Sequence, residues 1–383
     1  MVWSLIYVKN KEIITIGFGP AGLSVVQKAH AKGLGVEAID PTNEIGGGLL
    51  GDVSLTSNSP GADFTEPYVD CNPRALTLAE AQPLIGTTVP VKLKLACSFL
   101  HSVAKCAVND GWVSHTKEKA LGVVQTPNGY LVNTPKQKFI TSRLFLTLGA
   151  KEELLPELSN RDASITYKAG EIFSHYRDEE LATALKENPH VIIIGNSHGA
   201  YSVVGKLLKA FPNIRIDMLK RSDTKPFFES VDEAKSFRYQ VTAKDSICPD
   251  TGRINRYDGI RGKARDLWYR ETQDNLDHRL YSHTDTTLNA LDLSGKAILV
   301  QAIGFERNNV PFSRLDGSEL KYRTIPTPQG FAQAVEIGGD PLPGVTAIGL
   351  GSSEKIGTNV FHEQAKDALE VPLPNPLPEL LAI

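Results

Sequence analysis

The sequence IITIGFGPAGLSVVQKAHAKGLGVEAID, residues 13–40, decides the fold of this chain. Its first four residues are β-branched and mostly apolar, which predicts a short buried strand of a parallel sheet. A glycine-rich turn follows over residues 17–22, and apolar residues then recur at helical spacing as far as residue 29. A second apolar strand over residues 36–39 ends at Asp40. The stretch therefore predicts a strand–turn–helix–strand unit.

The spacing of the glycines indicates what this unit binds. In a G-x-G-x-x-G turn, the first glycine permits the tight turn, the second lets a pyrophosphate approach the backbone, and the third lets the helix pack closely on the strand. The amides at the helix start carry partial positive charge toward the phosphates, and an acid after the second strand can accept hydrogen bonds from ribose hydroxyls. We therefore predict a dinucleotide site rather than a glycine-rich turn of an ordinary βαβ unit. Its residues are Gly17, Gly19, Pro20, Ala21, Gly22 and Asp40.

Length and composition predict a globular protein of two or three domains. The 383 residues are 41% hydrophobic and 22% charged, and the net charge of −3 gives no support for binding to nucleic acid or to an anionic membrane. The four cysteines form no CxxC pair, which argues against a zinc site and a redox disulfide and favours a reducing compartment. The nine histidines show no HxxxH or HExxH spacing, so no metal site is predicted. No apolar run approaches the roughly 20 residues of a membrane span, so we expect a cytoplasmic protein.

A second unit of the same layout begins at an apolar strand over residues 190–194. It enters the turn Gly195-Asn196-Ser197-His198-Gly199-Ala200, a helix to residue 210, and a strand over residues 214–219 that ends at Lys220-Arg221. A basic pair in place of the acid can hold the 2′-phosphate that distinguishes NADP from NAD, although Arg221 could also be an exposed loop residue. The turn is formally G-x-S-x-G, so a hydrolase with Ser197 as nucleophile is a lesser alternative.

Other segments are predicted more coarsely. A triple glycine at residues 46–48 suits close approach to a flat or phosphorylated ligand, and residues 55–61 suggest a polar turn. We expect a helix from residue 93 with residues 95, 99, 100 and 103 on one face, a hairpin over residues 122–133 and a strand over residues 139–148. Residues 222–290 suggest a loop-rich cap with a helix over 262–275. Further strands over 297–302 and 345–348 precede a final helix over 359–369.

Together these landmarks resemble a known family. The order GFGPAG, GGG, TLGA, GNSHGA, AIGF and GVTAIGLG, over residues 13–369, resembles the two-dinucleotide-domain flavoproteins, and among them the class B flavin monooxygenases. That group includes flavin-containing monooxygenases, Baeyer–Villiger monooxygenases and ornithine or lysine N-hydroxylases. The resemblance implies an α/β fold of two Rossmann-like domains, with the NADP domain inserted in the FAD domain. The FAD domain would span 1–155 and 291–383, and the NADP domain 160–290 with the cap at 222–290.

The resemblance also implies roles for individual residues. The first glycine turn and Asp40 would bind FAD, Gly47 and Gly48 would lie over the flavin with Leu49 next to them, and Gly349 and Gly351 would lie beside it. Gly149 and Gly304, also expected at the cofactors, belong to segments that resemble the two Ala-Thr-Gly crossings between the domains. NADPH would bind at Gly195, Asn196, Ser197, His198 and Arg221. Asn58 would lie near the isoalloxazine, and His175 belongs to a motif resembling the monooxygenase fingerprint, with a Gly-to-His gap one residue longer; a structural role for His175 is the alternative. Ser197 also departs from the family, because it replaces a glycine.

The implied activity is the insertion of one oxygen atom from O2 into a small molecule through a C4a-(hydro)peroxyflavin. N-oxygenation, S-oxygenation and Baeyer–Villiger oxidation all remain open, because residues 222–290 contain no motif that identifies a substrate. One alternative is a flavin-dependent NAD(P)H oxidoreductase without oxygen insertion, and a second is a non-catalytic flavin-binding module. The expected partners are the substrate and O2, without nucleic acid or a membrane span, and the resemblance makes a homo-oligomer a candidate assembly.

Overall fold

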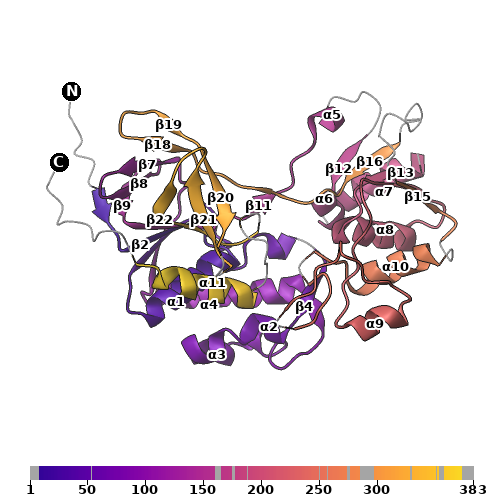
Figure 1. The fold of residues 1–383 in the computed structure, drawn as a ribbon, viewed down its shortest axis with the longest axis horizontal. Coiled ribbons are helices and arrows are strands. Elements are labelled where there is room, and N and C mark those ends of the chain that lie inside the picture. Colours follow the sequence, from indigo (N-terminus) through magenta and orange to yellow (C-terminus); the bar gives the residue numbers. More distant parts are fainter. Residues whose placement is uncertain are drawn as a thin grey trace. The chain divides into compact units, whose positions relative to one another are not determined.

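The chain folds into two compact units, one of them inserted in the other (Figure 1). The computed structural model describes residues 8–52, 54–159, 165–174, 177–187, 189–249, 251–256, 258–273, 277–284, 297–327, 330–350, 352 and 358–372. The first unit comprises Met1–Lys151 and Arg307–Ile383, and the second comprises Glu152–Glu306. The short strands β11 (Ala150–Lys151) and β17 (Glu306–Arg307) lie where the chain passes from one unit to the other. No helix among these residues is long and apolar enough to cross a membrane.

A mostly parallel seven-stranded sheet forms the centre of the first unit. Its order is β20-β21-β22-β10-β2-β3-β6, in which β22, β10, β2, β3 and β6 run parallel. Every residue of β2 and β3 is buried, as expected for strands covered on both faces. The strands are β2 (Ile13–Ile16), β3 (Val36–Ile39), β6 (Val113–Thr116), β10 (Arg143–Leu146), β20 (Tyr322–Pro326), β21 (Ala332–Glu336) and β22 (Pro341–Ala347).

Three helices cover one face of this sheet, and they are seen together along it in Figure 1. They are α1 (Pro20–Ala31), α4 (Leu93–Asn109) and α11 (Thr358–Glu370). The predicted apolar face of α4 is correct for Phe99, Leu100 and Val103, which are buried, but wrong for Leu95, which is 40% exposed. The smaller elements between α1 and α4 are η1 (Gly48–Asp52), β4 (Thr56–Pro60), α2 (Ala62–Thr65), α3 (Tyr68–Cys71), η2 (Pro73–Thr77), η3 (Ala79–Ala81) and β5 (Pro90–Lys92).

A second sheet packs on the opposite face, with an apolar core between the two sheets. Its order is β1-β9-β8-β7-β18-β19, and it contains the predicted hairpin, in which Gly129 takes the left-handed φ of 138° at the turn. Its strands are β1 (Val8–Asn10), β7 (Gly122–Thr126), β8 (Gly129–Asn133), β9 (Lys138–Thr141), β18 (Phe312–Arg314) and β19 (Glu319–Leu320).

Two predicted segments differ from the structure. The single strand expected over residues 139–148 is two strands, β9 and β10, in different sheets. The chain turns between them because the Thr141 hydroxyl donates to the Arg143 carbonyl at 3.0 Å and accepts from the Arg143 amide at 3.0 Å. The turn expected over residues 55–61 is instead strand β4, which pairs antiparallel with β5.

The second unit has a five-stranded parallel sheet of order β12-β16-β13-β14-β15. Helices α8 and α10 pack against each other, and α6 packs on α8. The strands are β12 (Thr166–Lys168), β13 (His190–Ile194), β14 (Arg215–Lys220), β15 (Leu280–Thr284) and β16 (Ile298–Gln301). The helices are α5 (Pro156–Ser159), α6 (Ala169–Phe173), α7 (Asp178–Glu187), α8 (His198–Ala210), α9 (Val231–Ser236) and α10 (Gly262–Thr272).

The loop-rich segment between β14 and α10 is organised by one buried asparagine. Asn255 is fully buried at a left-handed φ of 49°. Its side-chain amide donates to the Pro226 carbonyl at 2.9 Å and to Asp245 at 2.8 Å, and its side-chain carbonyl accepts from the Ser246 amide at 3.0 Å. Because a buried polar group without partners is costly, this set of bonds defines one conformation of the loop.

A buried carboxylate joins three strands of the second unit. Asp217 of β14 is 1% exposed, and it accepts hydrogen bonds from His190 of β13 at 2.7 Å, His283 of β15 at 2.6 Å and Arg215 at 3.0 Å. Burial raises the pKa of the Asp217 carboxyl, but these hydrogen bonds lower it more, so its pKa lies below the ordinary value. A group with a lowered folded-state pKa stabilises the fold above its unfolded pKa and loses that contribution as pH falls through the folded pKa.

The Asp217→Asn variant is therefore expected to unfold more easily by roughly 2–3 kcal/mol at pH 7, because hydrogen bonds to a charged acceptor are lost. Urea unfolding at pH 7 and at pH values down to 3 measures this. The difference from wild type should shrink as the Asp217 carboxyl becomes protonated at the acid end. Asp232→Asn, in an ion pair whose aspartate side chain is 89% exposed, is the matched control and should change little. A pH-independent difference for Asp217→Asn would contradict this account.

Candidate functional site

The first glycine turn (residues 17–22) has a geometry that excludes side chains. Gly17 takes a φ of 102°, and a Cβ atom there would lie 2.2 Å from the carbonyl oxygen of Thr147 on the neighbouring strand end. A Cβ on Gly22 would lie 2.3 Å from the carbonyl oxygen of Gly17. Both positions therefore require glycine for packing of the protein itself.

Gly19 differs from Gly17 and Gly22, because a side chain at this position would point into open space rather than into the protein. It is the N-cap of α1 with φ −78° and ψ −163°, a conformation that any residue can adopt, and no side chain caps the helix start. A Cβ on Gly19 would come within 4 Å of only one described atom, the Gly48 Cα at 3.8 Å. The helix start is thus open, and the free amides at a helix N-terminus suit an anion such as a phosphate group.

Asp40 lies beside this turn with its carboxylate fixed in place. Its Oδ2 accepts from the Phe18 amide at 2.8 Å, and its Oδ1 accepts from the Thr42 amide at 2.8 Å and hydroxyl at 2.7 Å. Oδ1 already accepts two hydrogen bonds, but Oδ2 accepts only one, so the carboxylate can still accept a hydrogen bond from a ribose hydroxyl through Oδ2. Sequence reasoning predicted Asp40 but not the Phe18 amide that holds it.

The triple glycine packs against the same turn. Gly46 donates its amide to the Phe18 carbonyl at 2.5 Å, and the Gly48 position would place a Cβ 3.5 Å from the Gly19 Cα and 3.4 Å from Pro20. A Cβ on Gly47 would lie 2.4 Å from the Cys97 sulfur, so Gly47 is required by packing on α4. Leu49 follows with 67% of its surface exposed. The structure thus brings Gly19, Pro20 and Gly48 together.

The remaining predicted residues of the first unit follow neighbouring strands at the same edge of the sheet. Gly149 follows β10 with φ 65°, and Gly349 follows β22 with φ 109° and a would-be Cβ 3.1 Å from the Ala21 Cβ. Thr147 was not predicted as a turn-stabilising residue, yet its hydroxyl donates to the Gly17 carbonyl at 2.8 Å. His175 and Gly351 lie outside the described residues, as does the side chain of Asn58, and their roles stay predictions.

The second glycine turn (residues 195–200) repeats the first in detail. Gly195 takes φ 126°, and a Cβ there would lie 2.3 Å from the Ala302 carbonyl oxygen. This matches the first turn, where a Cβ on Gly17 would meet the Thr147 carbonyl oxygen. Gly195 donates its amide to the Leu219 carbonyl at 3.0 Å, just as Gly17 donates to Ile39 at 2.9 Å. Gly304 follows β16 with φ 100°. The fold therefore presents two equivalent strand–turn–helix sites, one in each unit.

Ser197 occupies the position of Gly19 and is not a nucleophile. A nucleophile elbow holds its serine on a strained turn, whereas Ser197 is an ordinary N-cap with φ −85° and ψ −177°. Its hydroxyl lies 3.4 Å from the Ala302 carbonyl oxygen, to which it donates. The neighbouring His198 directs its Nδ1 to the Arg261 amide at 3.3 Å. The hydrolase alternative is therefore wrong.

His198 begins α8 as a neutral side chain. Burial lowers the pKa of the His198 imidazole, and the Arg261 charge lowers it further. The hydrogen bond from the Arg261 amide to the neutral imidazole joins the start of helix α8 to the loop before α10. His198 is thus held by the protein, while the adjoining Ser197 is exposed.

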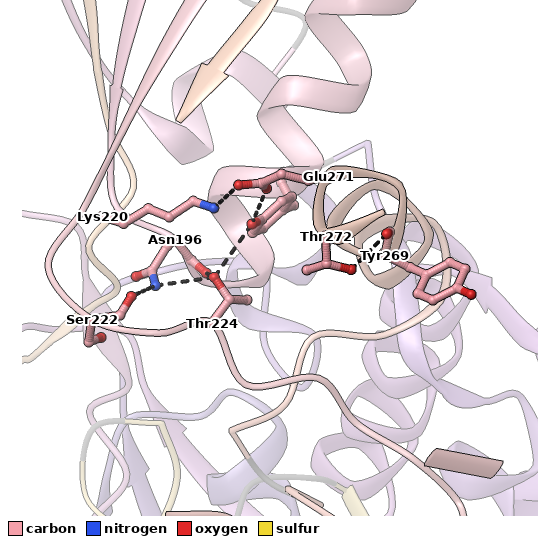
Figure 2. A network of polar contacts seen from close by, with 8 residues as sticks. Asn196, Lys220, Ser222, Thr224, Tyr269, Glu271 and Thr272 are labelled. Atoms are coloured by element: carbon pink, nitrogen blue, oxygen red, sulfur yellow. Dashed lines mark hydrogen bonds and ion pairs between the residues drawn. The ribbon is translucent and has the colours of Figure 1, made fainter. Parts of the chain in front are cut away.

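A polar network surrounds the strand end where the basic pair was predicted (Figure 2). Arg221 is exposed, whereas Lys220 is buried and ion-paired with Glu271 of α10. Asn196 of the turn donates to the Ser222 carbonyl at 2.6 Å and to the Thr224 hydroxyl at 3.2 Å. Glu271 could not be predicted from sequence patterns, because it lies 51 residues beyond Lys220 and belongs to another element.

The comparisons with known proteins agree with this geometry. No protein-family model matches the chain. A curated relative, the CMP-5′-(3-aminopropyl)phosphonate hydroxylase of Streptomyces rubellomurinus, is 25% identical over 88% of this chain and 85% of its own length. Among solved structures, the ornithine hydroxylase of Pseudomonas aeruginosa is 14% identical with a TM-score of 0.58, covering 94% of this chain and 98% of that one. The fold is that of the two-dinucleotide-domain flavoproteins.

Two further structures show the breadth of the fold. The flavin-containing monooxygenase of Stenotrophomonas maltophilia has a TM-score of 0.58 at 11% identity, and the bacillithiol disulfide reductase of Staphylococcus aureus has a TM-score of 0.53 at 13% identity. Each alignment covers 94% of this chain and 98% of the other. The resemblance to class B flavin monooxygenases is confirmed, and the matches agree with the predicted FAD-dependent oxidoreductase that uses FAD and NADPH. The residues of the first glycine turn fit FAD, because the Gly19 edge is open and Asp40 is fixed beside it.

Alanine at two of these glycines should separate binding from folding. Gly19→Ala is expected to keep the stability of the apoprotein but lower FAD affinity by about 100-fold or more, roughly 3 kcal/mol, because its methyl group points to the phosphate position. Gly22→Ala should destabilise the apoprotein itself by roughly 1–3 kcal/mol, because its methyl group meets the Gly17 carbonyl. Urea unfolding of the apoproteins and calorimetric FAD titration measure both. Retention of wild-type FAD affinity by Gly19→Ala would place the phosphates elsewhere.

Proposed function

We propose that this protein is an FAD- and NADPH-dependent monooxygenase that adds one oxygen atom of O2 to the nitrogen of a small primary amine. The observation that carries the proposal is the duplicated glycine turn, one beside an acid and the other beside an exposed arginine. Two such sites in one chain suit an enzyme that passes reducing equivalents from a nicotinamide nucleotide to a flavin. The balanced reaction is R–NH2 + O2 + NADPH + H⁺ → R–NHOH + NADP⁺ + H2O.

The first unit supplies the flavin site in this proposal. The amides at the start of α1 bind the pyrophosphate, and Asp40 orients the adenosine ribose through its fixed carboxylate. Gly48 allows the triple-glycine loop to lie against the turn that holds the cofactor, while Gly47 holds the same loop on α4. Bound FAD would supply the chemistry that the chain lacks, namely acceptance of hydride and reduction of O2.

The second unit supplies the NADPH site. The amides at the start of α8 bind the pyrophosphate, beside the exposed N-cap residue Ser197. Arg221 is exposed at the strand end, and its guanidinium suits a 2′-phosphate by geometry and charge. The substitution of serine for glycine leaves the turn itself unstrained, since this position has an ordinary φ of −85°.

The amine substrate is inferred from the relative. The hydroxylase of Streptomyces rubellomurinus is named for a substrate with a 3-aminopropyl group, and the two chains align over most of their lengths. A neutral amine has the nucleophilic lone pair that an electrophilic oxygen donor requires. A terminal amine on a phosphonate or nucleotide carrier is therefore the first substrate class to test, ahead of thioethers and ketones.

The disulfide reductase neighbours favour a second candidate, a flavin-dependent NAD(P)H oxidoreductase without oxygen insertion. Its disulfide branch has little support, because none of the four cysteines belongs to a CxxC pair. Burial also raises the pKa of the Cys71 and Cys97 thiols, which disfavours the reactive thiolate form. Transfer of electrons to a quinone or protein acceptor is the branch that remains.

Product analysis under ¹⁸O2 distinguishes these functions. With NADPH and (3-aminopropyl)phosphonate or its CMP conjugate, we expect a hydroxylamine that contains one ¹⁸O atom and a matching consumption of NADPH. Stopped-flow spectra should show an intermediate distinct from both oxidised and reduced flavin before reoxidation. Consumption of NADPH with only hydrogen peroxide as product, across amines, thioethers and ketones, would favour the second candidate. Absence of any flavin reduction would contradict both and indicate a non-catalytic flavin-binding module.

A further inference from the structure

The register of the second unit places Lys220, rather than Arg221, at the position that Asp40 occupies in the first. The Gly17 amide donates to Ile39 and the Gly195 amide to Leu219, and the residues that follow these two acceptors are Asp40 and Lys220. In a Rossmann unit, this position faces the adenosine ribose. A lysine there would attract a 2′-phosphate if its ammonium group were directed toward the ligand.

The ammonium group of Lys220 is directed instead toward Glu271 of α10 (Figure 2). The two side chains are only 10% and 13% exposed, and they form a close ion pair. The Lys220 nitrogen also lies 5.6 Å from the centre of the Tyr201 ring, within cation–π range. A nearly buried cation is stable only with a partner, and Glu271 supplies the opposite charge.

Glu271 is in turn held to the glycine turn through a chain of hydrogen bonds. Its Oε2 accepts from the Tyr201 hydroxyl at 2.7 Å, and that hydroxyl lies 3.4 Å from the Thr224 hydroxyl. Thr224 accepts from Asn196 of the turn at 3.2 Å. Burial, followed by the Glu271 charge, raises the pKa of Tyr201, so the phenol remains a donor. The orientation of Glu271 is therefore fixed by the same residues that form the nucleotide site.

We propose that Glu271 is a positioning residue that withholds Lys220 from the adenosine 2′-phosphate, so that selection of NADPH over NADH depends on Arg221. This inference rests on the second dinucleotide site of the proposed function. A carboxylate in contact with the ammonium group cancels most of its attraction at the phosphate position and itself repels a phosphate dianion. The exposed guanidinium of Arg221 has no such compensation from Glu271. The wild-type protein should accordingly accept both nucleotides, with a moderate preference for NADPH.

Titration of the FAD-loaded, full-length protein with two adenosine ligands tests the inference. Adenosine 2′,5′-bisphosphate carries the 2′-phosphate of NADPH, and 5′-AMP lacks it, so calorimetry gives the ratio of their affinities without turnover. Glu271→Gln should raise the affinity for the bisphosphate about five- to tenfold and change that for 5′-AMP less than about twofold, because Lys220 becomes available. Arg221→Ala should lower the bisphosphate affinity by about tenfold at a similar 5′-AMP affinity.

A double variant serves as the control. Lys220→Met combined with Glu271→Gln removes both charges of the pair, so it should return the affinity ratio to within about twofold of the wild-type value, because the paired ammonium group does not contribute in the wild-type protein. An unchanged ratio in Glu271→Gln overturns the inference. A selective loss of bisphosphate affinity in the double variant, relative to wild type, also overturns it, and this result can be read even where Glu271→Gln alone fails to fold.

The outcomes also separate this inference from the monooxygenase proposal. The expected shift in ratio, without any oxygenated product, would sustain the role of Glu271 and contradict the monooxygenase. Formation of the oxygenated product with an unchanged affinity ratio would sustain the monooxygenase and contradict the role of Glu271. Absence of binding by both adenosine ligands would overturn this inference together with the NADPH site.

Discussion

The close passage of a neighbouring strand behind each glycine turn is the constraint on which both units depend. In the first unit the carbonyl of Thr147 occupies the space of a Gly17 side chain, and in the second the carbonyl of Ala302 does the same behind Gly195. The turn can then bring the helix start directly over the strand end. This geometry directs the amides of α1 and α8 away from their sheets, so that each helix begins at an accessible edge.

The same backbone carries opposite charges in the two units. The strand end of the first unit presents a carboxylate held by the Phe18 and Thr42 amides, whereas the second presents a lysine neutralised by Glu271 and an exposed arginine beside it. Asp40 and Lys220 thus occupy the same position in the two units but carry opposite charges. A side chain from another element changes the charge at this position: Glu271 of α10 neutralises Lys220 and so weakens its attraction for an anionic ligand.

The sequence predicted those parts that depend on local patterns. Both glycine turns, the strands before them and the helices after them follow from apolar runs and glycine spacing within about thirty residues. The strand expected over residues 139–148 failed because its apolar run is continuous, and the break depends on the hydroxyl of Thr141. The strand β4 was missed because its sequence, TSNSP, lacks alternation and pairs with residues some thirty positions later.

The candidate site shows the same limit. Asp40 could be predicted because an acid after the second strand has an established role, but Lys220 and Arg221 are adjacent and only the register distinguishes them. Ser197 suggested a nucleophile because the letters G-x-S-x-G do not record backbone angles. Glu271 was beyond prediction, since α10 approaches β14 only in three dimensions. The pairing of charges that are distant in the sequence is therefore the part of the site that sequence patterns do not reveal.

The insertion of the second unit has a consequence for the order of assembly during synthesis. Strand β22 and helix α11 complete the first unit's sheet and its helical layer, yet both follow the entire second unit in the chain. During synthesis, the edge of β10 that pairs with β22 stays unpaired while residues 152–306 are made. Those residues contain all five strands of the second unit's sheet. The second unit, encoded in the middle of the chain, can thus fold first, and the first unit, encoded at both ends, is completed last.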